Sequence, residues 1–132
     1  MPKIVLEPLS RGLVQESGAG LLLKGQQSVT ATEDGTGTGQ IDASKGTVVL
    51  ASATNAAHIV TLPAAAEGLM FVIYIGANGC ELRSSDPATV AINGGAAAGA
   101  ELALAANSSH VCVCLSSTSW LVLSGTAVAA AA

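Results

Sequence analysis

Residues 58–75, HIVTLPAAAEGLMFVIYI, decide the fold that this sequence predicts. The β-branched and aliphatic residues 59–62 suit a pleated, half-buried strand, and Pro63 ends that strand because proline has no backbone N–H to donate. After a short connection that turns at Gly68, residues 69–75 form an unbroken apolar run of strand length. We therefore expect two strands that face each other across this connection and form the centre of the core.

The rest of the chain continues this pattern of short strands and turns. Strand-forming runs recur roughly every 8–12 residues, and Asn-Gly, Gly-Gly and Ser-rich turns separate them. This spacing predicts an all-β fold, an antiparallel β-sandwich or barrel, with hairpins over residues 69–83 and 110–123. The other runs that we expect to be strands are residues 3–6, 28–32, 47–51, 89–92 and 101–105, with a brief strand or edge segment at residues 40–43.

The 132 residues predict one domain with three parts. Residues 1–27 lack the regular strand–turn spacing, so we expect an extended N-terminal arm or irregular extension. An irregular first hairpin of the same domain is the alternative. Residues 28–126 form the expected β-rich core domain. Residues 127–132 are mostly alanine, and we expect a flexible tail.

Composition restricts the classes of function. Half of the residues are hydrophobic, but only 2% are aromatic and 11% are charged, against about 25% charged in a typical globular chain. The lean aliphatic core suggests that partner subunits supply part of the burial. The net charge is −4, and the five Lys and Arg residues do not cluster, so we expect no nucleic-acid partner. The apolar stretches are too short for a membrane span, so we expect no membrane partner.

Cysteine usage and the first residues predict where the chain is made. Three cysteines make an odd number, which predicts no disulfide framework. The short apolar run after Met1 is interrupted by Glu7 and Pro8, so it does not resemble a cleavable signal. We expect synthesis in a reducing host cytoplasm.

His110, Cys112 and Cys114 are the strongest chemical candidates, because they alternate along one predicted strand and point to one face. Such a group could bind zinc, with Cys80 and His58 as further ligands, or form a Cys–His nucleophile pair. However, the zinc spacing C-x₂-C is missing, and apolar residues separate the candidates. We expect the cysteines to fill the core and His110 to lie at the rim of the strand, with no metal and no cofactor.

The remaining candidates have simpler interpretations. Residues 35–39, GTGTG, resemble a phosphate-binding loop only in their glycines, and we expect a surface loop. Asp34 and Asp42 fit no calcium-binding loop and no catalytic carboxylate pair. Trp120 and Tyr74 could stack on a sugar, but their apolar strands predict packing in the core.

A set of short segments carries a resemblance. VTLPAAAEG at residues 60–68, the apolar strand that follows, ATVAINGG at residues 88–95 and SSTSWLVLSG at residues 116–125 occur here in one order and spacing. Together they resemble small β-rich modules of tailed-phage virions, which occur in head decoration (cement) proteins, head fibres and tail-fibre domains. The resemblance covers residues 47–125 and brings no catalytic residues.

The resemblance implies a structural virion protein that is not an enzyme. It implies a homotrimer on the capsid exterior, which binds the major capsid protein at a local three-fold axis and reinforces the shell. The alternative is a fibre or host-recognition module that binds a surface glycan. We expect the arm to contact the capsid or a neighbouring subunit, by adding a strand to a sheet edge, for example. The arm residues predicted to make this contact are Lys3, Ile4, Val5, Leu6, Leu9, Arg11, Leu13, Leu21, Leu22 and Leu23.

Overall fold

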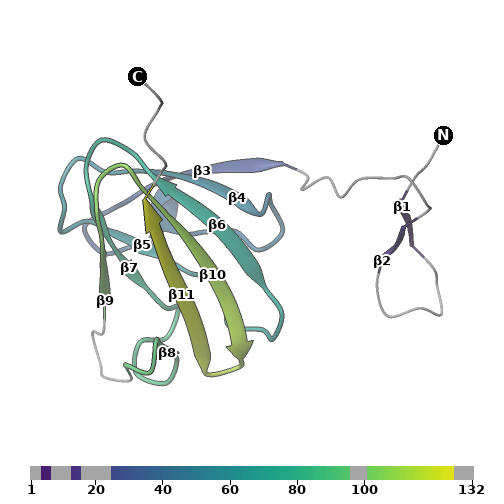
Figure 1. Cartoon of the computed structure of the whole chain (residues 1–132). Helices are drawn as coiled ribbons and strands as arrows, with labels where there is room; N and C mark the ends of the chain where they lie inside the picture. Colours follow the sequence, from purple (N-terminus) through teal and green to yellow (C-terminus); the bar gives the residue numbers. More distant parts are fainter. Residues whose placement is uncertain (1–3, 7–12, 16–24, 96–100, 127–132) are drawn as a thin grey trace.

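Two stacked β-sheets build the fold in the computed structural model, which describes residues 4–6, 13–15, 25–95 and 101–126 (Figure 1). The large sheet has six strands in the order β3-β4-β6-β10-β11-β8, and the small sheet has three in the order β5-β7-β9. Within the described residues there is one short 3-10 turn, Gly37–Gly39, and no α-helix. The prediction of an all-β fold is confirmed.

The strands are short, and most lie close to the predicted runs. The large sheet contains β3 (Gln26–Thr30), β4 (Val48–Ser52), β6 (Met70–Ile75), β8 (Ala91–Ile92), β10 (Ser108–Ser116) and β11 (Ser119–Thr126). The small sheet contains β5 (Ile59–Thr61), β7 (Cys80–Arg83) and β9 (Glu101–Leu104). A separate antiparallel pair is made by β1 (Ile4–Leu6) and β2 (Leu13–Gln15).

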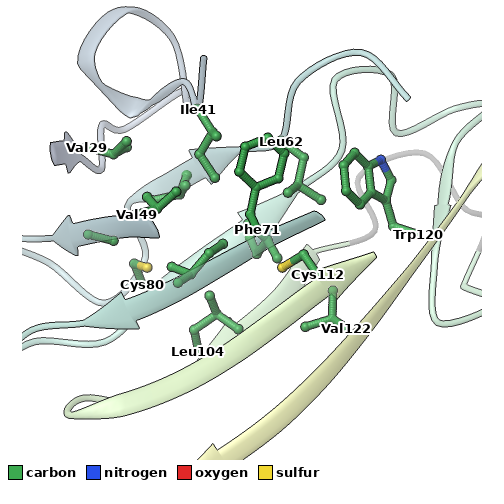
Figure 2. Packing of buried hydrophobic residues seen from close by; sticks show 14 of the residues in the cluster. Val29, Ile41, Val49, Leu62, Phe71, Cys80, Leu104, Cys112, Trp120 and Val122 are labelled. Carbon is green, nitrogen blue, oxygen red and sulfur yellow. The ribbon is translucent and has the colours of Figure 1, made fainter. Parts of the chain in front are cut away.

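The core is one cluster of side chains from the facing sides of both sheets (Figure 2). Trp120 on β11 is fully buried, and its ring centroid lies 6.3 Å from that of Phe71 on β6. Leu82 and Leu104 close the cluster from the small sheet. Val60 on β5 also belongs to this cluster, together with Phe71, so residues 58–75 lie at the centre of the core as predicted.

The predicted hairpin over residues 69–83 is wrong, because β6 and β7 belong to different sheets. β6 already pairs with β4 on one side and with β10 on the other, so neither of its edges is open to β7. The connection is held to the end of β4, where Gly76 N–H donates to the Ala51 carbonyl and Asn78 donates to the Ala53 carbonyl. β5 and β6 also belong to different sheets, so they face each other across the core and are not hydrogen-bonded neighbours.

The sheets are mixed, which corrects the expectation of purely antiparallel pairing. β4 pairs in parallel with both β3 and β6, and β5 pairs in parallel with β7. The antiparallel hairpin of β10 and β11 was predicted and is confirmed, with Cys112 opposite Val122. Parallel neighbours need crossover connections, and from β4 to β10 consecutive strands alternate between the two sheets.

The loop at residues 32–40 lies along the free edge of β5. Thr32 and Gln40 bridge to the free edge of this strand, at Ile59 and Thr61 respectively. Between them Gly35 has a φ of +72°, and a Cβ atom at that position would lie 2.4 Å from the Thr61 hydroxyl oxygen. The glycine-rich segment therefore closes the small sheet, because only glycine combines this backbone angle with this close approach.

The N-terminal predictions can be placed only in part. Ile4, Val5 and Leu6 form β1, close to the short strand predicted at residues 3–6, and Leu13 begins β2, which lies where we expected a loop or arm. The other predicted contact residues of the arm lie outside the described residues, as does the predicted tail at residues 127–132. Those contact residues are Lys3, Leu9, Arg11, Leu21, Leu22 and Leu23.

Candidate interaction surface

The outer side of the large sheet is apolar. Along β6 and β10 every second side chain is buried, and the outward side chains between them are apolar throughout β6 and from Val111 to Leu115 on β10. Tyr74 is among the outward ones, between buried Ile73 and Ile75, so its predicted place in the core is wrong. An antiparallel sheet with one wet face normally alternates apolar and polar residues, whereas strands covered on both sides are apolar throughout.

The strand register gathers these outward side chains into one patch. Val111 on β10 lies opposite Val72 on β6 and Leu123 on β11, and Leu50 on β4 lies opposite Tyr74. The most exposed members are between 40% and 55% exposed. We call the whole set the large-sheet face: Val48, Leu50, Met70, Val72, Tyr74, Val111, Val113, Leu115, Leu121 and Leu123.

Charge is absent from this sheet. Of the charged residues in the described part of the chain, none lies on a strand of the large sheet. The small sheet carries Glu81, Arg83 and Glu101, and an ion pair of 3.8 Å joins the last two. The outward residues of β3 beside the large-sheet face are polar but uncharged: Gln26, Ser28 and Thr30. The two sides of the molecule therefore differ sharply in polarity.

The carboxyl groups of Glu81 and Glu101 lie close together on the small sheet. A hydrogen bond that protonated Glu81 donates to Glu101 raises the pKa of Glu81, and burial and the charge of Glu101 act in the same direction. A shared proton of this kind is typical of two adjacent carboxylates. Both residues point outward, and Arg83 supplies the neighbouring positive charge.

A polar cluster lies on the inner side of the β10–β11 hairpin, at its open end. His110 is the third residue of β10, where we expected the rim of the strand, and it is buried there, with 3% of its surface exposed. Its Nε2 atom lies 2.6 Å from the Ser108 hydroxyl oxygen, and its Nδ1 atom lies 2.9 Å from the Ser124 hydroxyl oxygen. Burial lowers the pKa of His110, which favours the neutral ring.

The hydrogen bonds of Ser108 fix the roles of the ring nitrogens. The Ser108 hydroxyl donates its proton to the Ala105 carbonyl. Nε2–H of His110 must then donate to Ser108, and Nδ1 must accept from Ser124. The hydroxyl proton of Ser108 therefore points away from the ring, whereas that of Ser124 points toward Nδ1. These hydrogen bonds satisfy both ring nitrogens of the buried histidine.

The cysteines fill the core, as predicted. Cys80, Cys112 and Cys114 are all buried and free. Burial raises the pKa of Cys112 to about 12, and burial together with the charge of Glu81 raises that of Cys80 to about 11. A thiol with such a pKa is protonated at neutral pH, whereas nucleophilic cysteines are thiolates in exposed, electropositive places.

No metal site is formed in the described part of the chain, where no three His, Cys, Asp or Glu residues gather closely enough to hold an ion. Asp34 and Asp42 each close a local turn instead. Hydrogen bonds from Thr36 lower the pKa of Asp34, and those from Ser44 lower the pKa of Asp42. These carboxylates stabilise their loops, as such turns usually do.

Two shallow grooves adjoin the Gly37–Gly39 turn. One, of about 490 Å³, runs past Thr61, Pro63 and Ser85, and the other, of about 540 Å³, runs past Ser28 and Thr30. Both are lined by the side chains of Gln40, Asp42 and Lys45, so they offer amide, carboxylate and ammonium groups but no aromatic ring.

Sequence reasoning did not single out the large-sheet face, although the signal was present. The unbroken apolar run at residues 69–75 and the similar runs in β10 and β11 are typical of strands covered on both sides. We used them only to predict the core. To recognise the second covered side, the alternating side chains of each strand must be assigned to the inner or the outer face of the sheet. This assignment requires the register of the strands.

Comparisons of this chain with protein-family models, curated proteins and solved structures find no match. In the described part of the chain, no helix has the length and apolar character needed to cross a bilayer.

Proposed function

We propose that this chain is a structural protein of a tailed-phage virion, which decorates the capsid exterior as a homotrimer and reinforces the shell by binding the major capsid protein. The proposal includes no enzymatic activity and no cofactor. The capsid, the virion location and the three-fold assembly come from the resemblance of residues 47–125 to phage head and fibre modules.

One structural observation supports this proposal above the others. The large-sheet face combines exposed apolar side chains with a complete absence of charge on the strands that carry it. Contiguous apolar patches of this kind mark sites of protein–protein contact. A protein built to assemble into a shell needs such surfaces, and avidity across many copies then supplies affinity without any single dominant residue.

The test is binding to capsids from which this protein has been removed. The full chain, added back to stripped capsids, should co-sediment with them up to a fixed number of copies and should raise their resistance to heat or low salt. A monomer that leaves stripped capsids unbound and unprotected would refute the proposal. A capsid-free sample of the same age controls for aggregation.

The second candidate is a fibre or host-recognition module that binds a surface glycan. The two polar grooves beside Gln40, Asp42 and Lys45 favour it, because amide and carboxylate groups are hydrogen-bond partners for sugar hydroxyls. If the protein is a glycan-binding module, an array of bacterial surface glycans should give hits that disappear in Gln40→Ala. An array without hits, with the protein located on the head, would remove it.

A further inference from the structure

We infer that the large-sheet face is where copies of this chain meet, with the faces of three copies turned toward a common three-fold axis. This inference rests on the proposed function for the number of copies, and it adds the surface through which they associate.

The exposure of the face points to a partner that is present as soon as the chain folds. Leu115 and Leu123 are more than half exposed, and Leu50, Met70 and Tyr74 are nearly as exposed. A sheet face of this kind, left in water until a capsid is available, would stack on other sheets. Another copy of the same chain is made at the same time and place, so it can cover the face without delay.

The composition of the face also fits a copy of itself. Interfaces between permanent homomeric subunits are more apolar than transient ones, and their centres are depleted of charge. The large-sheet face has no charge, so two copies of it meet without repulsion between like charges. The uncharged polar residues Gln26, Ser28 and Thr30 beside it match the polar rim of such an interface.

Simple geometry allows three faces to close around an axis. β4, β6, β10 and β11 are neighbours, and four strands at about 4.8 Å spacing make a face about 19 Å wide. Three such faces, closed as a triangular prism, each lie about 5.5 Å from the axis. Packed sheets are separated by about 10 Å, so one layer of side chains from each sheet would fill this prism.

The closed arrangement assigns a place to each strand. β6 and β10 are the middle strands, so Val72 and Val111, which lie opposite each other, come nearest to the axis. β4 and β11 lie at the two sides of the face. In a cyclic trimer unlike sides meet, and Val48, Val72, Val111 and Leu123 lie at one level across the face, so Val48 of one copy approaches Leu123 of the next.

The first experiment places a charge on the face of the full chain. Leu123 is 55% exposed, so Leu123→Lys fits the folded single chain, and circular dichroism and thermal unfolding verify its fold. Native mass spectrometry should show the wild type as a trimer and Leu123→Lys as a monomer. The matched control, Ala103→Lys at an exposed position of the small sheet, should remain a trimer. A folded Leu123→Lys that stays trimeric would overturn the inference.

The second experiment tests the three-fold arrangement by crosslinking. The three natural cysteines are buried, so cysteines introduced on the outward side of the large sheet react first. The double variant Val48→Cys/Leu123→Cys, mildly oxidised, should give covalent trimers on a non-reducing gel, whereas each single variant should not. Crosslinking that stops at covalent dimers contradicts the three-fold closure.

The two proposals can fail separately. If the wild type is trimeric and binds stripped capsids while folded Leu123→Lys keeps the trimer, the function stands and the choice of surface is wrong. If the wild type is a monomer that ignores capsids, the proposed function itself fails, and the inference about its surface fails with it.

Discussion

At the scale of single residues, His110 shows how this domain accommodates a polar group inside. The ring is buried, but both nitrogens have hydroxyl partners, on Ser108 and Ser124. A buried polar group without a partner costs about 1–3 kcal/mol, so these contacts decide whether the histidine is tolerated. The pKa lowered by burial then makes stability depend on pH.

We predict that His110 makes the protein less stable in mild acid. Its pKa is lowered from 6.5 in the folded state, so the unfolded chain binds the proton more readily. Stability should therefore fall as pH decreases below about 6.5 and level off at the folded pKa. Urea unfolding of the wild type and of His110→Gln between pH 8 and 5 measures this. Equal pH slopes for the two proteins would contradict the prediction.

Trp120 should be the most costly single truncation in the core. Its ring is fully buried against Phe71, in a core with few other rings. Trp120→Ala should lower the free energy of unfolding by about 3–5 kcal/mol, and Trp120→Phe by less, because the smaller ring leaves a smaller cavity. Both variants are compared with the wild type at one protein concentration, since association would contribute to stability. An Ala variant as stable as the wild type would be inconsistent with this core.

At the scale of elements, β11 has an edge that is only partly paired. β8 pairs only with Ser119 and Trp120, and beyond it the Asn93 side chain forms hydrogen bonds with the strand edge. This amide accepts from Val122 N–H at 2.8 Å and donates to the Val122 carbonyl at 3.1 Å. Asn93 also has a φ of +52°, which asparagine tolerates better than most residues.

We predict that Asn93→Ala destabilises the protein by about 1–3 kcal/mol, because it loses two hydrogen bonds to the strand edge and strains the backbone. Asn93→Gly serves as the control, since it loses the same hydrogen bonds but keeps the backbone relaxed. Chemical denaturation should rank wild type, then Asn93→Gly, then Asn93→Ala. An Ala variant more stable than the Gly variant would contradict the argument about the backbone.

The elements also show what the sequence could and could not predict. β7 and the β10–β11 hairpin depend on local signals, namely alternation and turn residues, and both were predicted from them. The place of β6 between β4 and β10 depends on pairing between distant segments, which local patterns do not reveal, so the expected hairpin at residues 69–83 was wrong. The parallel pairs were missed for the same reason.

The candidate surface was predictable in composition but not in position. Few charges and few aromatic residues indicated that partners complete the burial. The register was needed to bring Val72, Val111 and Leu123 together on one side. The resemblance to phage modules directed attention to the N-terminal arm, whereas the structure directs it to the large sheet.

At the scale of the whole molecule, the two outer sides of the sandwich have different chemistry. The small sheet carries Glu81, Arg83 and Glu101 and suits water or a polar neighbour. The large sheet carries no charge and exposes the large-sheet face. A single copy in water would leave that face wet, and we propose that other copies of the chain cover it.

The mass of the full chain in solution tests this requirement most directly. Sedimentation equilibrium or native mass spectrometry, at micromolar concentration and physiological salt, should give three chain masses with little free single chain. A single chain mass across that concentration range, with the fold intact by circular dichroism, would contradict the account.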